Sequence, residues 1–198
     1  MVDTDASSGQ DRRPGLLICA YETDDPAWDM VEDLSGRLWD PPGARTVTVS
    51  AADSEALAGA LMTRLKTGEC QAALLVGRSS RAPGFRIQMR AENRAPGQNR
   101  RLSQTGPGIA RSTAPVVDML RAIEEAGLDV DASSEAEDDV GSYLLYRMLS
   151  EWADSPEAPA IGLLRVPGPA DERLVSKAVR AAASAMARRL APLPRTPA

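Results

Sequence analysis

The sequence contains no histidine among its 198 residues. An imidazole is the base in Ser-His-Asp and Cys-His catalysis and a common metal ligand, so these enzyme classes and His-ligated metal sites are excluded. No apolar run approaches the roughly 18 residues that a membrane span requires. Aromatic residues make up only 4%, with a single Phe, so the core must consist mainly of Leu, Val, Ile, Met and Ala.

Cysteine is scarce as well. Cys19 lies within the apolar run 16–20, and Cys70 precedes another apolar run, so neither belongs to a CxxC pair. The N-terminus has no apolar stretch behind a basic start, unlike a secretory signal. We therefore expect a cytoplasmic protein with two reduced thiols. We expect Cys19 to be a buried, inert side chain, and we predict no metal and no cofactor.

The chain carries a net charge of −5, which gives no reason to expect nucleic-acid binding by the molecule as a whole. Its length suits one domain. We predict a disordered lead-in over residues 1–14, a single domain over residues 15–190 and a frayed tail over residues 191–198. The lead-in is polar, and the tail is rich in proline.

Apolar or β-branched runs alternate along the chain with segments of helical periodicity. We predict strands at 16–20, 46–50, 72–77, 85–91, 128–132 and 161–166. We predict helices from 25 to 41 and at 54–66, 113–125, 140–152 and 171–190. Residues 85–91 alternate apolar with polar side chains and predict a half-exposed strand at an edge, followed by a long loop over 95–108.

Several predicted strands are apolar on both faces, which is typical of a sheet covered by helices on both sides. The sequence therefore predicts one α/β domain with three α/β/α layers around a mostly parallel, twisted sheet. In such folds, sites form where loops leave the carboxyl ends of strands. The loops to inspect follow Ala20, Gly77, Ala132 and Val166.

Four stretches of the chain, taken in order, resemble the pyroglutamyl peptidase I family, whose members are cytoplasmic cysteine peptidases that remove N-terminal pyroglutamate. Residues 25–29 resemble the family's Asn-Pro-Ser-Trp-Glu, and residues 106–115 resemble its Gly-Pro-Ala-Ala-Tyr-Phe-Ser-Thr-Leu-Pro. Residues 140–146 resemble the helix that starts at the catalytic cysteine. Residues 163–167 resemble the strand Phe-Ile-His-Val-Pro. The resemblance implies the pyroglutamyl-peptidase architecture, related to phosphorylase and hydrolase folds, and a homo-oligomer.

The departures from the family pattern fall on the catalytic positions. The resemblance places Gly141 at the position of the cysteine, Arg165 at that of the histidine and Phe85 at that of the glutamate. Glycine has no nucleophile, and a guanidinium accepts no proton near neutral pH. In enzymes from which the nucleophile and its base have been removed by mutation, the catalytic rate falls by a factor on the order of 10⁶. The resemblance therefore implies a protein without this peptidase activity.

The resemblance also implies a vestigial pocket whose apolar walls have become partly carboxylate. Its candidate residues are Tyr21, Asp24, Asp138, Asp139, Val140 and Ser142. We predict that Arg165 or Arg86 pairs with Asp138 or Asp139, and that a salt-bridge network fills the pocket and blocks an uncharged substrate. Such a network would add little net stability.

Two charged segments flank this predicted pocket. Residues 129–139 hold six acids and no base, which is typical of a solvated loop entering a helix N-terminus; they lack the ligand spacing of a divalent-cation site. Residues 78–101 hold seven arginines and one acid. They predict either an edge kept soluble by charge or a surface for an anion or a protein, with Arg78, Arg81 and Arg86 as candidate anion ligands.

Three functions follow. The first is a binding, scaffold or regulatory module whose partner is a protein or a small anionic ligand. The second is a hydrolase in which Asp138, Asp139 or Glu137 acts as acid or base and Arg165 binds an anionic substrate. The third is an anion or nucleic-acid binder working through Arg78–Arg101. Few aromatics interleave these arginines, which weakens the nucleic-acid form of this hypothesis.

Overall fold

The computed structural model describes residues 13–21, 40–47, 49, 53–79, 81, 83–98, 100–153, 155–168 and 170–190. The helix predicted from residue 25, the pocket residue Asp24, most of the lead-in and the tail lie outside the described residues.

A six-stranded sheet forms the centre of the molecule, in the order β2-β1-β3-β8-β4-β7. Its strands are β1 (Gly15–Ala20), β2 (Arg45–Val47), β3 (Cys70–Ser79), β4 (Phe85–Gln88), β7 (Val130–Ser133) and β8 (Ala160–Pro167). All neighbouring pairs are parallel except β4 and β8. The central strands β1, β3 and β8 are almost fully buried, as their continuous apolar runs predict.

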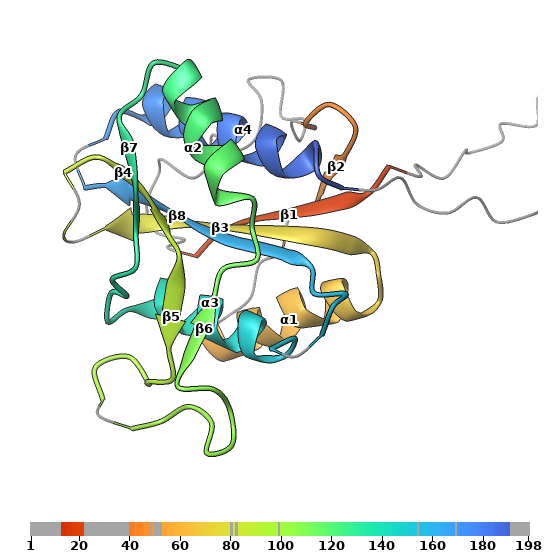
Figure 1. Cartoon of the computed structure of the whole chain (residues 1–198), viewed down its shortest axis with the longest axis vertical. Helices are drawn as coiled ribbons and strands as arrows, with labels where there is room; N and C mark the ends of the chain where they lie inside the picture. Colours follow the sequence, from red (N-terminus) through yellow and green to blue (C-terminus); the bar gives the residue numbers. More distant parts are fainter. Residues whose placement is uncertain are drawn as a thin grey trace, which may run out of the picture.

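Helices cover both faces of the sheet, so the predicted three layers are confirmed (Figure 1). The helices α2 (Val116–Glu125) and α4 (Glu172–Ala187) pack on one face. The helices α1 (Ser54–Lys66) and α3 (Val140–Ser150) pack on the other. Within the described part of the chain, no helix is long and apolar enough to cross a membrane.

The helix boundaries follow local chemistry. The carboxylates of Asp53 and Asp139 accept hydrogen bonds from backbone N–H groups in the first turns of α1 and α3. After α1 and α2 the chain turns at Gly68 and Gly127, each with a φ of 73°, a conformation that glycine adopts without strain. These ends match the predicted ones to within a few residues.

The prediction of one edge strand over residues 85–91 is wrong. β4 is an internal strand, between β8 and β7. Its charged Arg86 is accommodated there because Asp131, opposite it on β7, binds its guanidinium through two nitrogens at 2.7 Å each. The chain then leaves the sheet and forms a separate ribbon of β5 (Arg90–Glu92) and β6 (Ile109–Arg111).

We call residues 90–111 the arginine arm. It comprises β5, β6 and the loop between them, and it projects from the body of the molecule on the side of α3 (Figure 1). The buried side chain of Asn93 organises this loop. Its Oδ1 accepts from the N–H groups of Leu102 (2.8 Å) and Ser103 (2.9 Å), and its Nδ2 donates to the carbonyl of Ser103 (2.8 Å). The arm therefore has a defined shape although it contains few strand residues.

Candidate functional site

The centre of the candidate site is the side chain of Arg165, on β8, which is 0% exposed. Transfer of a guanidinium out of water costs on the order of several kcal/mol unless partners replace the lost hydration. Arg165 lies on the sheet face that packs against α3, because its neighbour Leu164 packs toward α2 and α4. Burial of a charge at this position therefore requires acceptors from α3 and from the adjacent strands.

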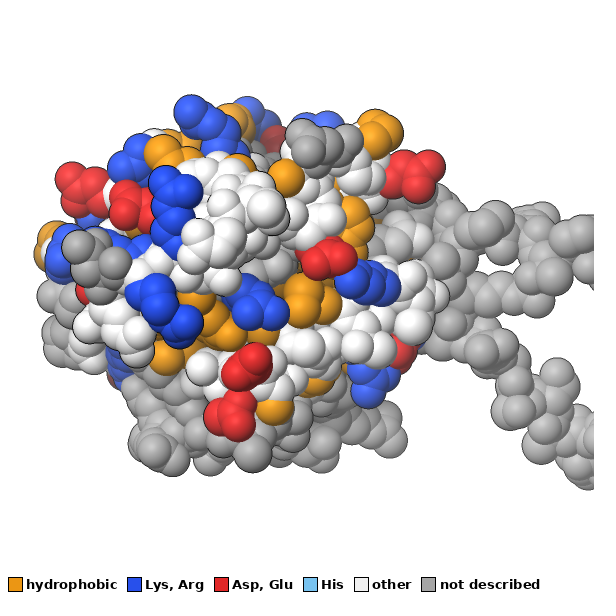
Figure 2. Space-filling view, turned by 90° about the horizontal axis from the view of Figure 1, so that it is seen from below, with side chains coloured by type: hydrophobic (Ala, Val, Ile, Leu, Met, Phe, Trp, Pro, Cys, Tyr) orange, Lys and Arg blue, Asp and Glu red, His pale blue; other side chains and the backbone are white. Residues whose placement is uncertain are grey.

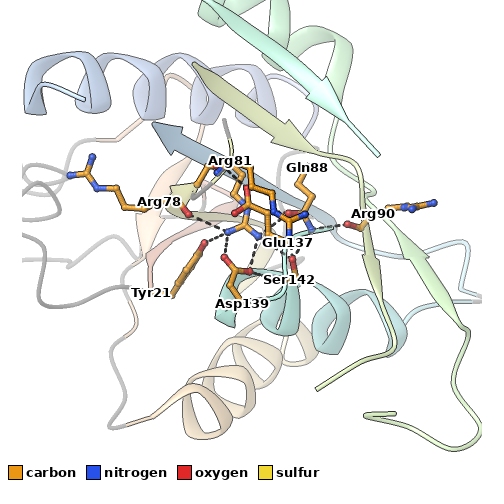
Figure 3. A network of polar contacts seen from close by, with 10 residues as sticks. Tyr21, Arg78, Arg81, Gln88, Arg90, Glu137, Asp139 and Ser142 are labelled. Carbon is orange, nitrogen blue, oxygen red and sulfur yellow. Dashed lines mark hydrogen bonds and ion pairs between the residues drawn. The ribbon is translucent and has the colours of Figure 1, made fainter. Parts of the chain in front are cut away.

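The acceptors surround the guanidinium on several sides (Figure 3). Asp139 binds it with both oxygens, at 2.5 Å to Nη1 and 2.8 Å to Nη2. The amide oxygen of Gln88 accepts from Nε at 3.0 Å and from Nη2 at 2.8 Å. The Tyr21 hydroxyl accepts from Nη1 at 2.6 Å, and Ser142 Oγ accepts from Nη2 at 3.0 Å. Every nitrogen of the guanidinium thus has an acceptor.

This environment keeps Arg165 charged. Burial alone would lower the pKa of Arg165, but the hydrogen bond to Asp139 and the nearby negative charges of Asp139 and Glu137 raise the pKa above its ordinary value. A guanidinium in this state donates hydrogen bonds and accepts no proton. The predicted ion pair between Arg165 and Asp139 is confirmed. Arg86 binds Asp131 instead of Asp138 or Asp139.

Asp139 also closes the N-terminus of α3. Its Oδ1 accepts from the Ser142 N–H at 2.9 Å, so one carboxylate serves both the helix end and the buried cation. Its oxygens are therefore occupied on the side that faces the protein. The side chain keeps 30% exposure on its other side.

Tyr21 occupies the space between two glycines. A Cβ added at Gly77, on β3, would overlap the phenol ring of Tyr21. A Cβ added at Gly141, in the first turn of α3, would overlap the Tyr21 hydroxyl and lie 2.8 Å from Arg165 Nη1. Contacts below 3.0 Å are essentially absent around real Cβ atoms, so a side chain at either position displaces Tyr21. The absence of a side chain at Gly77 and Gly141 leaves the space that the Tyr21 ring and hydroxyl occupy.

Gln88 connects the site to the arginine arm and was missed by the sequence analysis. Besides Arg165, it binds Ser142 Oγ (3.0 Å) and the carbonyl of Arg90 (2.8 Å) through its Nε2. Its side chain is buried. Gln88 carries a neutral amide and lies in a segment predicted to be half exposed, so its residue type indicated no function. The one available signal was its alternation with Phe85 and Ile87, which places it on the opposite face of the strand.

The structure places the remaining predicted residues around or outside this cluster. Glu137 is buried and accepts from Ser79 Oγ at 2.5 Å, whereas the exposed Asp138 accepts from the Gly97 N–H at 3.0 Å. Val140 is partly exposed on the first turn of α3. Phe85 is not part of the site, because it packs in the core on the sheet face that α2 and α4 cover.

The arginines predicted to bind an anion do not form one cluster with free guanidinium groups. Arg78 donates to the carbonyls of Pro167 (3.0 Å) and Gly168 (2.7 Å), and Arg86 is paired with Asp131. Arg81 contacts Ser79 through its backbone N–H. Two of the three guanidinium groups therefore bind within the protein.

The described residues leave little room on the side of the site where α3 begins. A cavity of about 10 Å³ lies against it, lined by Glu92, Arg94, Ala136, Glu137, Asp138, Asp139 and Ser142. A volume of roughly 10–15 Å³ holds a single water molecule. Within the residues described, no cluster of three or more Cys, Asp or Glu side chains is arranged to hold a metal ion.

Both thiols are free and buried, as predicted for Cys19. Burial raises the pKa of Cys19 to about 12. Burial and the charge of Glu69 raise the pKa of Cys70 to about 11. Cys70 borders a cavity of about 400 Å³, but it begins β3, at the opposite end of that strand from Gly77 and the site. Neither sulfur is a thiolate at neutral pH.

The sheet order, the antiparallel pairing of β4 with β8 and the helices of the described residues on both faces define an α/β domain with the pyroglutamyl peptidase fold. Solved structures of this class match most of the chain. The pyrrolidone carboxyl peptidase of Thermococcus litoralis superimposes with a TM-score of 0.75 at 14% identity, over 93% of this chain and 100% of that one. Pyroglutamyl peptidase I of Bacillus amyloliquefaciens gives a TM-score of 0.70 at 17% identity, over 89% and 98%.

A third structure, the pyrrolidone carboxyl peptidase of Thermus thermophilus, gives a TM-score of 0.69 at 20% identity, over 86% of this chain and 98% of that one. No protein-family profile matches the chain. No curated protein matches it either. The expected architecture is thus confirmed as a fold.

Proposed function

We propose that this protein has the pyroglutamyl peptidase fold without that peptidase activity, and that it acts as a binding or scaffold module. One observation carries the proposal: Tyr21 and Arg165 fill the volume into which any side chain at position 141 would extend. By the sequence resemblance, Gly141 and Arg165 stand where the family has its cysteine and histidine. The site is thus occupied by a salt bridge and a phenol.

The protonation states of the thiols support the same conclusion. A cysteine peptidase requires a thiolate, and a nearby base or cation must lower the thiol pKa to produce it. Here burial raises the pKa of Cys19 and of Cys70. Both sulfurs are therefore protonated at neutral pH, and Cys70, which borders a cavity, lies at the opposite end of β3 from the site.

The contacts of the carboxylates argue against a hydrolase built on Asp138, Asp139 or Glu137. Asp139 is bound by Arg165 and by the first turn of α3, and Glu137 is buried against Ser79. Asp138 is exposed. The adjoining 10 Å³ cavity holds no substrate. A general base needs a free oxygen within hydrogen-bond reach of the proton it removes.

The test is release of a fluorophore from a pyroglutamyl conjugate by the purified protein, with a buffer blank and an active pyroglutamyl peptidase I run in parallel. We expect the protein to match the blank. Turnover well above the blank that also disappears in the Cys19→Ser/Cys70→Ser variant would overturn the proposal. Turnover that disappears in Asp138→Asn would support the carboxylate hydrolase instead.

A further inference from the structure

The arginine arm has a charge opposite to that of the rest of the molecule. Residues 90–111 contain five arginines and one acid, within a chain of net charge −5. The single acid, Glu92, lies 3.6 Å from Arg90 and 3.9 Å from Arg94. Among the described residues, no carboxylate pairs with Arg100, Arg101 or Arg111. The carboxylates of the described residues thus leave most of the positive charge on the arm unpaired.

Three of these arginines line a hollow. A cavity of about 370 Å³ opens to solvent on the arm, bordered by Glu92, Asn93, Arg94, Arg100, Arg101, Gly108 and Ile109. The side chain of Ile109 is 46% exposed and adds an apolar contact. Figure 2 looks onto this end of the molecule, where basic and acidic side chains are interspersed with exposed hydrophobic atoms. The volume lies at the lower end of the roughly 300–1,000 Å³ typical of ligand pockets.

The arm is held in place by the body of the protein. Gln88, which binds Arg165, also donates to the carbonyl of Arg90 at the start of the arm. The carbonyl of Pro107 accepts from the Tyr146 hydroxyl at 2.8 Å, and the Gly97 N–H donates to Asp138. A surface that is already ordered loses little conformational entropy when a partner binds.

We propose that the arginine arm docks an acidic segment of a partner protein, with Asp or Glu side chains bound by Arg94, Arg100 and Arg101. The proposal rests on the proposed function, since it names the partner of the binding module. The planar guanidinium matches a carboxylate with two parallel hydrogen bonds, and Ile109 gives an apolar contact that a peptide can use. The Arg165 cluster then serves as the support on which this surface is built.

Two other occupants fit the surface less well. A nucleic acid fits less well because residues 90–111 contain no aromatic side chain on which a base could stack. A small free anion would meet only solvated guanidinium groups, where single ion pairs are weak. A peptide combines several such pairs with the contact at Ile109.

The test is fluorescence polarisation with a labelled peptide of alternating Glu and Ala, compared with the same peptide carrying Gln for Glu. We expect the full chain to bind the Glu peptide and not the Gln peptide. In the Arg94→Gln/Arg100→Gln/Arg101→Gln variant we expect an affinity loss of about tenfold or more, since three charge-assisted contacts are removed. The variant Arg121→Gln/Arg173→Gln/Arg188→Gln changes the net charge equally, at exposed positions on α2, on α4 and directly after α4, and should bind within about twofold of the native chain.

Several results overturn the proposal. One is no binding of the Glu peptide, or an equal loss in both triple variants. Another is tighter binding of a single-stranded oligonucleotide, or complete competition by inorganic pyrophosphate at concentrations near that of the peptide. A third is a molar mass in solution that falls to one chain only in the arm variant, which would assign the arm to contact between copies. None of these binding results depends on peptidase turnover. The fluorophore assay therefore tests the proposed function independently of the arginine arm.

Discussion

At the scale of single residues, Arg165 explains why the site has its present form. A fully buried guanidinium needs an anion and several neutral acceptors, and Asp139, Gln88, Tyr21 and Ser142 supply them. The charge pair contributes little net stability by itself, because desolvation of the ions offsets their attraction. Its main effect is to fix the positions of Tyr21, Gln88 and the first turn of α3.

The ion pair gives a direct prediction for the Asp139→Asn variant. Asparagine caps a helix as well as aspartate does, so the substitution removes the charge and keeps the cap. A buried, unpaired guanidinium should then lower the free energy of unfolding by about 3 kcal/mol, measured by urea denaturation. The control is Asp53→Asn, at the N-cap of α1, where no buried arginine depends on the carboxylate and stability should stay close to that of the native protein. Equal effects of the two variants would contradict this role for Asp139.

The thiols give a prediction about reactivity and pH. The native pKa values are about 12 for Cys19 and about 11 for Cys70, against about 8.5 for an unfolded cysteine. The folded state therefore holds these protons more tightly, and this contribution to stability is complete below the unfolded pKa and lost as pH rises through 11 to 12. At pH 8, a chromogenic thiol reagent should label neither cysteine in buffer and both in urea. Rapid labelling of either in buffer would show an accessible thiolate.

At the scale of elements, the sequence predicted what packing alone determines. β1, β3 and β8 are apolar runs buried on both faces. The helices α1, α3 and α4 begin at capping aspartates, and α1 and α2 end at glycine turns. The ribbon of β5 and β6 was not predicted, because each strand has three residues and gains stability only from its partner across a long loop. The internal position of β4 depends on a cross-strand ion pair, Arg86 with Asp131, that no local pattern shows.

The candidate site likewise contains one contact that the sequence predicted and others that it did not. The pairing of Arg165 with Asp139 was predictable, since oppositely charged residues fell on two segments that the fold brings together. The roles of Gln88 and of the two glycines beside Tyr21 were not predictable. They depend on which face of a strand a neutral side chain takes and on van der Waals overlap between residues distant in sequence.

At the scale of the whole molecule, two neighbouring regions differ in whether their charges are paired within the protein or face solvent. The first is a closed polar cluster at the junction of β8, β4 and α3, whose charges are paired within the protein. The second is the arginine arm, whose charges face solvent. Gln88 and Asp138 link the two, so the packed cluster supports the exposed surface. This arrangement suits a module that binds through its surface.

The central claim is that Tyr21 and Arg165 occupy the space beside Gly141, and a double-mutant cycle of Tyr21→Ala and Gly141→Ala tests it most directly. In an ordinary helix, replacing glycine with alanine raises the free energy of unfolding by about 0.5–1 kcal/mol. We expect this gain at Gly59, which is exposed on α1 with open space around it. At Gly141 we predict a loss of about 1–3 kcal/mol in the native chain from overpacking, relieved in the Tyr21→Ala background. If Gly141→Ala instead stabilises the native chain as Gly59→Ala does, the space is open and the account is contradicted.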